Sequence, residues 1–581
     1  MGTNVTNEGG ISRRSFLGGV AGVGALAAMG LAGCSPKAAG TTGAESASSS
    51  ASAATGVADN NAVAVDDGSA AITVDWLGAP PEIGDITETK DTDLLIVGAG
   101  NGGMIAGAYA SDQKMDFILC EKGTEVGATR HWFNAVDTKP FTDQGYHTDR
   151  ARLHGEWARY SSGTCDHNLI NMWMNESNDM FEYVDKYMSE AGAVVIADEF
   201  EMPGGMGATP FYTPCGEHHY GNAEGGRDGV PVRNELFEKV MNDNGYEISY
   251  NHELVKLVTE DSGKVTGAIF KTDNGYTQIN AKKGVLLTTG DMAADREMMA
   301  HYNVSLSKIV RYNINTNDTG DGQKMGIWIG ADMDEFACGD LWPFAAVMMD
   351  GTLPTTFDGT HFYAGVANLP VLMVDGAGRR LMAENLPFQS PSIPKLTCTP
   401  DGCAWSIWDS AWKEKFPEGG YMVEDYTASN TQEEVDKNVE NGITFKFDTI
   451  EELCEHCGFD KDIFMATFER YNELCEAGED LDFYKDPLWM NAIDTPPFYA
   501  SKHCSSMTST RGGLKNDERC RVLDKEGRPI PGLYAAGNTA GSFYGNVYPP
   551  NVMGSGIGHG QCFAWLAVKD ILGLDYIHAN I

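Results

Sequence analysis

Basic residues are scarce in this sequence. Its 581 residues include 42 Lys and Arg against 82 Asp and Glu, which gives a formal net charge of -40. An acidic excess of this size repels the phosphates of nucleic acids and of anionic lipids. The composition therefore argues against a nucleic-acid-binding protein and against binding to anionic lipid, and it favours a soluble body.

The cysteine patterns of haem and iron–sulfur proteins are also missing. Thirteen cysteines are present, but none belongs to a C-x-x-C-H haem site or to a four-cysteine ferredoxin spacing. The one C-x-x-C pair, Cys454 and Cys457, lies in TIEELCEHCGFD, which has the pattern of a short amphipathic helix. We therefore interpret these two cysteines as structural thiols rather than as a cluster or a redox pair, and we predict no metal site.

The N-terminal region lacks the long apolar run of a transmembrane helix. Residues 12–17, SRRSFL, form a twin-arginine export signal, and the Gly- and Ala-rich segment that follows ends at LAGC, which resembles a lipobox. Such a signal predicts export of a folded protein with its cofactor already bound. We expect Cys34 to be acylated, and the mature protein to be anchored by lipid on the outer face of the cytoplasmic membrane, in the cell envelope.

Large apolar residues are almost absent from residue 35 to about residue 75, where Ala, Ser, Thr and Gly dominate. Such a segment cannot form a core. We therefore interpret residues 35–88 as a flexible tether between the signal, residues 1–34, and a globular part that begins near Thr89. The remaining chain is long enough for two or three domains.

The most informative stretch that is present runs from Asp93 to Glu121. A buried-strand pattern is followed by Gly98, Gly100 and Gly103 at G-x-G-x-x-G spacing, then by a helical stretch and a second strand. The glycines allow backbone N–H groups to reach a pyrophosphate at a helix N-terminus, and the acid after the second strand binds ribose hydroxyls. Together these features predict a bound dinucleotide.

Further motifs resemble the fumarate reductase and 3-ketosteroid dehydrogenase group of FAD flavoproteins. In chain order they are GATR at 127–130, TTGD at 288–291, NDTGDG at 317–322, GGL, VLD and PIPGLYAAGN between 512 and 538, and GSGIG at 554–558. The resemblance covers roughly residues 90 to 575. It implies an α/β fold: a Rossmann-like FAD-binding domain with a β-meander, plus an inserted α+β capping domain.

The same resemblance divides the globular part into three segments. They are the first part of the FAD-binding domain, residues 89–334, a capping or substrate domain, residues 335–495, and the second part of the FAD-binding domain, residues 496–581. A mobile cap over a flavin excludes water during hydride transfer. We therefore expect catalysis at the boundary between the cap and the FAD-binding domain.

The motifs also imply which residues bind FAD. The last helix opens near Gly556, and its N-terminal amides would stabilise the anionic reduced flavin. Asn538 stands where the family usually has a Glu that binds ribitol hydroxyls. The expected FAD-binding residues are Gly98, Gly100, Gly103, Glu121, Lys122, Thr129, Asp291, Asp321, Gly537, Asn538, Gly556 and Ile557.

The substrate must be argued from the site rather than from the fold. Four positions that bind or protonate the substrate in fumarate reductases differ in this chain. Trp342 replaces a His before Pro, Ser509 or Thr510 replaces a second His, Tyr548 replaces an Arg, and the position of the proton-donating Arg falls near Phe388. These departures argue against a small dicarboxylate.

Tyr548 precedes a proline, as does the Tyr that hydrogen-bonds the steroid ketone in ketosteroid dehydrogenases. A Tyr hydroxyl polarises a carbonyl, so that the β-carbon of an enone can accept hydride. At Phe388 the resembling motif of that branch has a proton-handling Tyr. Several aromatic residues are expected either to line an apolar pocket or to pack in the core: Trp342, Phe344, Phe362, Phe388 and Phe543.

The proton donor stays open between four residues. Arg511, directly before Gly512, is the first candidate, with Tyr548, Tyr363 and His361 as alternatives. Arg511 is equally suited to binding FAD or to capping a turn. The bulky residues Arg130, His131 and Trp132, in a loop where the family has small ones, either face the substrate or pack on the FAD-binding domain.

The combined prediction is an extracytoplasmic FAD-dependent reductase of an activated C=C bond, an enone or an enoate. Reduced flavin N5 gives a hydride, and a side chain protonates the neighbouring carbon. The alternatives are a 3-ketosteroid-like desaturase, a fumarate-type dicarboxylate reductase and, least favoured, a flavoprotein that only relays electrons. Because the chain has one dinucleotide fingerprint and no haem site, the electrons must come from an external donor: a quinol-linked membrane protein, a cytochrome or a flavoprotein.

Overall fold

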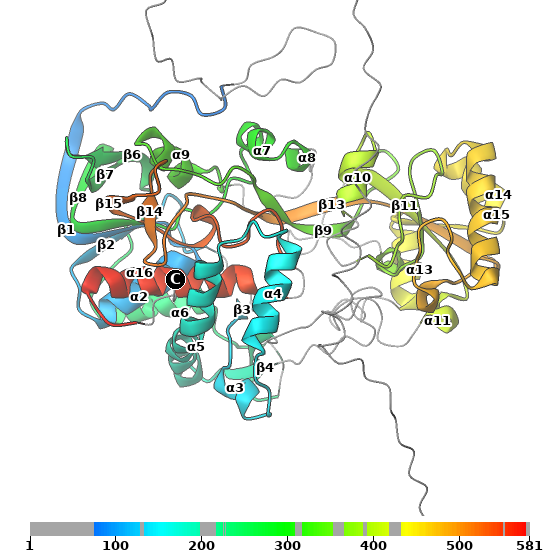
Figure 1. Cartoon of the computed structure of the whole chain (residues 1–581), viewed down its shortest axis with the longest axis horizontal. Helices are drawn as coiled ribbons and strands as arrows, with labels where there is room; N and C mark the ends of the chain where they lie inside the picture. Colours follow the sequence, from blue (N-terminus) through cyan, green and yellow to red (C-terminus); the bar gives the residue numbers. More distant parts are fainter. Residues whose placement is uncertain are drawn as a thin grey trace, which may run out of the picture. The chain divides into compact units, whose positions relative to one another are not determined.

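The structure is a computed structural model, and its elements form three β-sheets and the helices packed on them (Figure 1). It describes residues 75–127, 133–197, 217–224, 226, 228–307, 317–351, 365–386, 392–416, 431–549, 552 and 554–576.

The first sheet contains the nucleotide-binding stretch. Its order is β14-β15-β8-β1-β2, with β7 beside β8 and β6 beside β7. The strands are β1 (Ile86–Val97), β2 (Phe117–Cys120), β6 (Glu253–Thr259), β7 (Val265–Thr272), β8 (Gly275–Leu287), β14 (Arg521–Leu523) and β15 (Pro529–Ala535). The strands β2, β1, β8 and β15 run parallel, whereas β6, β7 and β14 pair antiparallel.

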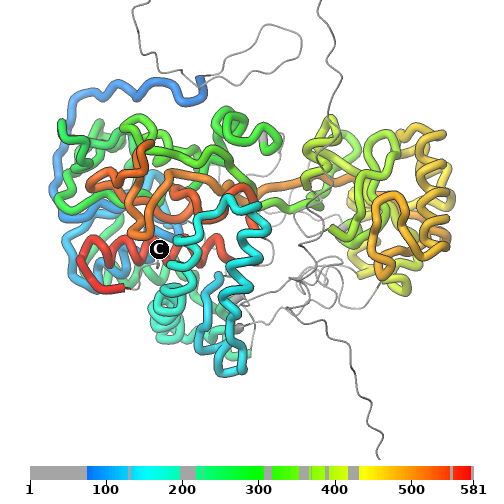
Figure 2. Tube along the Cα trace, viewed as in Figure 1, coloured from blue at the N-terminus to red at the C-terminus, as the bar shows by residue number. Residues whose placement is uncertain are grey.

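Both faces of β1 are buried, which explains its unbroken apolar run. Leu94 and Ile96 pack in one core cluster, and Leu95 and Val97 pack in another, because successive side chains point to opposite faces of a strand. The first cluster includes residues of helix α2 (Asn101–Asp112) and of α16 (Ser555–Leu572). These two helices, from opposite ends of the sequence, pack side by side (Figure 2).

The structure shows how this domain starts and how its β-meander is built. Packing begins before Thr89: β1 starts at Ile86, and the buried ring of Trp76 stacks on His301 with ring centroids 4.9 Å apart. The β-meander is confirmed, and its last strand, β8, is continuous. Its pairing with β1 continues across an irregularity between Thr92 and Leu94.

The second sheet forms the α+β cap. Its order is β10-β11-β13-β12, and β9 pairs with β13. The strands are β9 (Cys338–Ala346), β10 (Leu372–Val374), β11 (Cys403–Asp409), β12 (Thr444–Phe447) and β13 (Phe498–Arg511), and the helices are α10 (Ser392–Cys398), α13 (Gln432–Glu440), α14 (Ile450–Cys457) and α15 (Lys461–Ala477).

The predicted return of the chain to the FAD-binding domain at residue 496 is too early. Residues 498–504 of β13 still pair with β11, and residues 498–501 also pair with β12. Only the later part of β13, from His503 to Arg511, pairs with β9. The strand therefore belongs to the cap at its start and ends at Arg511, directly before the Gly512 motif of the FAD-binding domain.

The remaining elements belong to the FAD-binding side, apart from one short helix and two 3-10 turns between residues 365 and 489, which pack in the cap. A three-stranded sheet contains β3 (Phe133–Asn134), β4 (Val194–Ala197) and β5 (Glu217–Gly221), in the order β3-β5-β4. The helices are α3 (Lys139–Thr142), α4 (Arg150–Tyr160), α5 (His167–Glu190), α6 (Arg233–Asp243), α7 (Arg296–Tyr302), α8 (Val304–Ser307), α9 (Asp321–Trp328) and α11 (Trp412–Lys415), with 3-10 turns η2 (Gly365–Asn368), η3 (Pro487–Trp489) and η4 (Gly537–Thr539). Within the described ranges, no helix has the length and apolar character needed to cross a bilayer.

The C-x-x-C pair lies on a well-capped helix. Thr449 and Glu452 form a capping box at the start of α14, and Cys454 and Cys457 are buried in the cap core. Burial raises the pKa of both thiols. Among the described residues no group of three or more potential metal ligands includes them, and their role as structural thiols stays a prediction.

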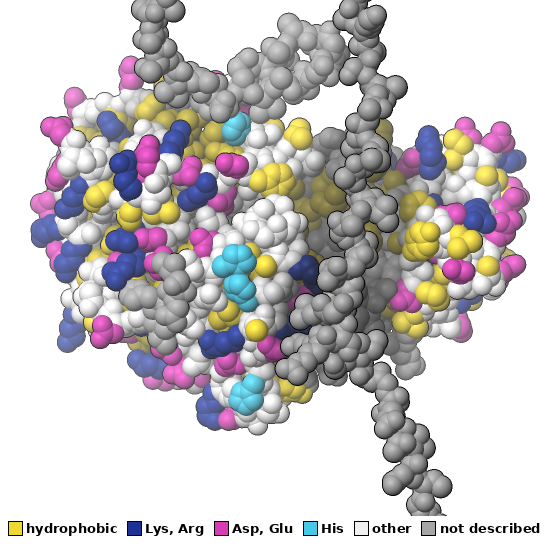
Figure 3. Space-filling view, viewed as in Figure 1, with side chains coloured by type: hydrophobic (Ala, Val, Ile, Leu, Met, Phe, Trp, Pro, Cys, Tyr) yellow, Lys and Arg dark blue, Asp and Glu magenta, His cyan; other side chains and the backbone are white. Residues whose placement is uncertain are grey.

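Acidic and basic side chains are interspersed over the described surface in view in Figure 3. The negative net charge is therefore not gathered into one acidic patch on that face.

Candidate active site

The glycine motif forms a cradle at the carboxyl end of β1. Gly98 has φ +102°, and a Cβ at Gly98 or Gly103 would overlap a backbone carbonyl oxygen, that of Thr288 or of Gly98 respectively. A Cβ at Gly100 would meet nothing within 4 Å. Two glycines therefore permit the tight strand-to-helix turn, whereas Gly100 leaves open space beside the N-terminus of α2, as the approach of a pyrophosphate requires.

Glu121 is fixed at the edge of this cradle. Its carboxylate accepts hydrogen bonds from the backbone N–H of Ala99 at 2.7 Å and of Gly123 at 2.8 Å. Lys122 and Asp321 form an ion pair of 2.7 Å, which connects the end of β2 to the start of α9. Direct contact of these three residues with FAD stays a prediction.

The first turn of α16 carries no acidic side chain, so its amides and dipole present a positive end. Gly554, with φ +72°, and Gly558 allow this turn to lie against the backbone of Phe133 and Asn134. A Cβ at Gly556 would collide with Nη2 of Arg511. The guanidinium of Arg511 therefore lies directly against the positive end of the helix.

Arg511 is buried at the end of β13. Its Nη1 donates to Oδ1 of Asn538 at 2.6 Å, and its Nη2 lies 3.9 Å from Oδ2 of Asp340. The guanidinium carbon lies 5.0 Å from the ring centroid of Tyr548 and 5.5 Å from that of Tyr544. Burial opposes its charge, but Tyr544 and Asp340 raise the pKa of Arg511 above its ordinary value, so it stays a cation.

Two polar atoms beside α16 are available to a ligand. Nε of Arg511 is buried and has no hydrogen-bond partner among the described residues. The hydroxyl oxygen of Tyr548 accepts from Oγ of Ser555 at 3.3 Å and from the Gly556 N–H at 3.4 Å, which leaves its own O–H proton to donate. Burial raises the pKa of Tyr548, so this hydroxyl is neutral.

Asp291 lies behind Asn538. Its carboxylate is fully buried and accepts from the Ala293 N–H at 2.7 Å, and Nδ2 of Asn538 lies 3.5 Å away. Burial raises the pKa of Asp291 to about 6, against the opposing effects of the Ala293 amide and the Arg511 charge.

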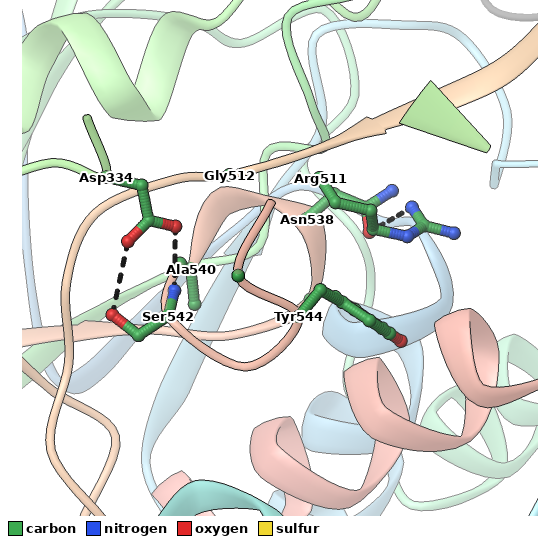
Figure 4. Close-up of a pocket in the computed structure, with 10 residues that line it drawn as sticks. Asp334, Arg511, Gly512, Asn538, Ala540, Ser542 and Tyr544 are labelled. Carbon is green, nitrogen blue, oxygen red and sulfur yellow. Dashed lines mark hydrogen bonds between the residues drawn. The ribbon is translucent and has the colours of Figure 1, made fainter. Parts of the chain in front are cut away.

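Arg511 and Asn538 also line a small pocket (Figure 4). Asp334 holds one wall in place by accepting from the N–H of Gly513 at 3.3 Å and from the N–H of Ser542 at 2.7 Å. The lining residues are Asp334, Arg511, Gly512, Gly537, Asn538, Ala540, Gly541, Ser542, Tyr544 and Gly545. The open cradle at Gly100, the positive end of α16 and the unpartnered Nε of Arg511 fit a bound FAD.

The structure brings together five residues that the sequence nominated: Tyr548, Arg511, Asn538, Asp291 and Gly556. Ile557 is partly buried, next to Gly556 on α16, and Gly537 lines the pocket. Ser509 pairs with Asp340 between β13 and β9.

The aromatic residues that the structure describes pack in hydrophobic cores, which was one of the two alternatives that the sequence left open. Phe543 is a core residue: its ring stacks on His559 at 4.0 Å and contacts Trp157 and Phe563, so it is not an open pocket wall. Trp342 and Phe344 are buried in the core of the cap, which contains many large apolar side chains. The predictions for Thr129, Arg130, His131, Trp132, His361, Phe362, Tyr363 and Phe388 fall outside the described residues.

Four residues near the site were missed from the sequence: Asp340, Tyr544, Ser555 and His559. Asp340 comes two residues before Trp342 on the same strand, and Tyr544 comes four residues before Tyr548, so both lay within reach of recognised positions. His559 lies one turn into α16, and burial lowers its pKa to about 3, so its imidazole is neutral. Its pairing with Phe543 could not be read from a sequence pattern.

The fold and the site together define an FAD-dependent oxidoreductase. The chain belongs to the family described as FAD binding domain, whose model matches residues 93–552. This assignment confirms FAD as the cofactor and confirms the predicted resemblance to flavoproteins that act on C=C or CH–CH groups.

Similar proteins come from the same group. The chain is 24% identical over 484 residues to a vinyl phenol reductase of Lactiplantibacillus plantarum, covering 80% of this chain and 93% of the relative. It is 24% identical over 575 residues to a digoxin reductase of Eggerthella lenta, covering 92% and 93%. A 3-ketosteroid Δ1-dehydrogenase from Sterolibacterium denitrificans has a similar fold, with TM-score 0.63, 18% identity, and coverage of 83% of this chain and all of that one.

Proposed function

We propose that this protein reduces the activated C=C bond of an enone or enoate, with a preference for substrates that present a carbonyl to Tyr548. The observation that carries the proposal is the convergence of the Tyr548 hydroxyl and the Arg511 guanidinium at the first turn of α16. A neutral donor and a fixed cation side by side suit an oxygen that becomes negative during reaction.

The bound FAD, when reduced, supplies the hydride. Tyr548 donates its free O–H proton to the substrate carbonyl, and this hydrogen bond strengthens as negative charge develops on the oxygen. The two hydrogen bonds that the Tyr548 oxygen accepts orient the hydroxyl and make it a better donor. Arg511 stabilises the same charge, and burial excludes water that would weaken both interactions.

The final proton transfer is assigned to Arg511 or Tyr548, because both carry N–H or O–H groups that the described residues leave available. Arg511 is a strong base when deprotonated and is held as a cation by its neighbours, so it delivers a proton only as part of a relay that restores its charge at once. Tyr363 and His361 stay alternatives.

The substrate class follows from what the site lacks as well as from what it holds. Trp342, Ser509 and Tyr548 stand at positions where fumarate reductases bind carboxylates, so a small dicarboxylate is a poor fit. Relatives named as vinyl phenol reductase and digoxin reductase support an unsaturated organic substrate for this chain.

The test is an anaerobic assay with reduced methyl viologen as electron donor and a panel of fumarate, urocanate, cinnamates, flavonoids and 3-keto-4-ene steroids. We expect turnover of a carbonyl-bearing alkene and a loss of about 100-fold in kcat/KM in Tyr548→Phe. Tyr534→Phe is the matched control, since the Tyr534 hydroxyl bonds Asp570 near the other end of α16. Turnover of fumarate with inert enones would refute the proposed substrate class.

We further propose that the protein works in the cell envelope and receives electrons from a quinol-linked membrane protein, a cytochrome or a flavoprotein. The twin-arginine signal and the LAGC sequence support this location. We expect the full-length protein in the membrane fraction and Cys34→Ala in the soluble fraction. Efficient reduction of the purified protein by NADH would contradict the external donor.

A further inference from the structure

Asp291 ends the TTGD turn and Asn538 follows the PIPGLYAAG stretch, and the structure brings these two side chains together. Asn538 accepts from Arg511 at 2.6 Å through Oδ1 and directs Nδ2 toward Asp291 at 3.5 Å. One amide thus bridges a buried carboxyl and the cation that abuts Gly556 on α16.

The charges around Arg511 are balanced before the flavin is reduced. Asp291 lies behind Asn538, and Asp340 of β9 lies 3.9 Å from Nη2 of Arg511. Among the described residues, Asp318 also brings a carboxyl group to this place, against Gly290. Gln323 of α9, a neutral group, bonds the backbone oxygens of Gly290 and Asn538. An additional negative charge at this place therefore shares Arg511 with Asp291 and Asp340.

We propose that Asp291 takes up a proton when the bound FAD is reduced. Two electrons from an external reductant and one proton convert FAD to its anionic reduced form, and a second proton neutralises the Asp291 carboxylate. The carboxylate is fully buried, close to Asn538 and Arg511, so a nearby negative charge favours its protonated form. Burial already raises the pKa of Asp291 to about 6, which places the change close to neutral pH.

This uptake matches the needs of the proposed reaction. Reduction of a C=C bond transfers one hydride from the flavin and consumes one further proton, so a reduced protein that has stored two protons and two electrons carries all that one turnover requires. The inference rests on the proposed function only where it assigns the proton stored on Asp291 to the reduction of a C=C bond. The measurement below contains no substrate, so its outcome is independent of the substrate class.

The experiment measures the midpoint potential of the FAD-loaded protein against pH by spectroelectrochemistry. For a two-electron couple, each proton taken up contributes about 30 mV per pH unit, because a tenfold change in the equilibrium corresponds to 29.6 mV. Between pH 6.5 and 7.5 we expect the midpoint potential to fall with the slope for two protons. Below pH 5.5, where Asp291 is already protonated, we expect the slope for one proton. In Asp291→Asn we expect the one-proton slope over the whole range.

Asp295→Asn is the matched control. It removes a carboxylate four residues away that pairs with Lys324, and it leaves an Asn that still caps α7, so it should keep the wild-type slopes. A one-proton slope throughout in the wild type, or a two-proton slope in Asp291→Asn, would overturn the proposal.

A second measurement needs no variant and covers the case in which Asp291→Asn does not bind FAD. Wild-type protein in weak buffer with an indicator dye is reduced by reduced methyl viologen, which releases no protons itself. We expect two protons taken up per FAD at pH 7 and one at pH 5. Equal uptake at the two pH values would contradict the proposal.

Discussion

Two buried arginines in this protein have opposite surroundings. In the cap, Arg380 contacts Glu384 through two hydrogen bonds of 2.9 Å and Asp480 through one of 2.7 Å, and Lys485 lies 3.2 Å from the same Glu384. At the candidate site, Arg511 has one short bond, to the neutral Asn538, and reaches its nearest carboxylate, Asp340, only at 3.9 Å.

The difference distinguishes an ion cluster that stabilises the fold from a charged group that can act on a ligand. In the Arg380 cluster each charge is paired with an opposite charge, and the guanidinium is further enclosed by the rings of Tyr471 and Phe483. Each guanidinium has one buried nitrogen without a hydrogen-bond partner among the described residues, Nη1 of Arg380 and Nε of Arg511. Arg511, however, lies 3.9 Å from its nearest carboxylate, so more of its interaction capacity is left for a ligand or for developing charge. Burial alone thus does not identify a functional arginine, whereas the distance to the carboxylate partners distinguishes these two.

The largest expected effect of a substitution is on the stability of the cap. Arg380→Met leaves Glu384 and Asp480 without their main cation, and breaking a buried ion pair costs about 3–5 kcal/mol. We expect a large fall in the thermal unfolding temperature of the FAD-loaded protein. If Arg380→Met melts like the wild type, the cluster does not stabilise the cap.

At the candidate active site, substitution of the arginine should lower activity rather than stability. Arg511→Met removes the cation that stabilises negative charge in the transition state, and removal of one such group typically costs about 100- to 1000-fold in kcat. We expect this loss in the methyl viologen assay with only a small change in unfolding temperature. Arg511→Lys, which keeps the charge, should recover part of the activity. A fully active Arg511→Met would remove Arg511 from the mechanism.

The third effect depends on pH. The raised pKa of Asp291 means that the folded state favours its protonated form, so this contribution to stability is complete below pH 3.8 and is lost as the pH rises through about 6. One pKa unit corresponds to about 1.4 kcal/mol, so the loss amounts to about 3 kcal/mol. We expect Asp291→Asn to be more stable than wild type at pH 8 and similar to it at pH 4, by thermal unfolding. An equal difference in unfolding temperature between Asp291→Asn and wild type at both pH values would contradict the raised pKa of the buried carboxyl group.

The smallest effect is expected at the surface. Arg528 pairs with Asp524 at 2.8 Å, and both side chains are accessible to solvent. Because water screens such pairs, Arg528→Ala should change neither the unfolding temperature nor kcat/KM measurably. A clear fall in the unfolding temperature or in kcat/KM would show that exposed ion pairs also contribute to the stability or activity of this protein.

The nucleotide-binding part was predictable because each of its residues has a local reason. Gly98 and Gly103 are required by a turn in which a Cβ would overlap the backbone, and Glu121 ends a strand whose position follows from the apolar pattern. The Tyr548 and Arg511 positions were reached through neighbouring proline and glycine motifs.

What could not be predicted depends on contacts between distant segments. Asp340 joins the site only because β9 pairs with the end of β13, about 170 residues later in the chain, and no local pattern encodes that pairing. The sequence left Phe543 open between a pocket wall and the core, because an aromatic side chain has the same sequence signal in either place, and the structure packs it on His559 in the core. The bridge from Asp291 to Arg511 through Asn538 likewise joins three separate segments.

The pairing of β9 with β13 has a mechanical consequence. These strands run together from the Ala346 and His503 pair to the Cys338 and Arg511 pair, with irregularities on either side of Ser506 and Met507. A two-stranded ribbon twists and bends at such bulges but does not lengthen, because covalent geometry fixes its span. A rotation of the cap about this ribbon would therefore reach Asp340 and Arg511, because both residues lie on the paired strands.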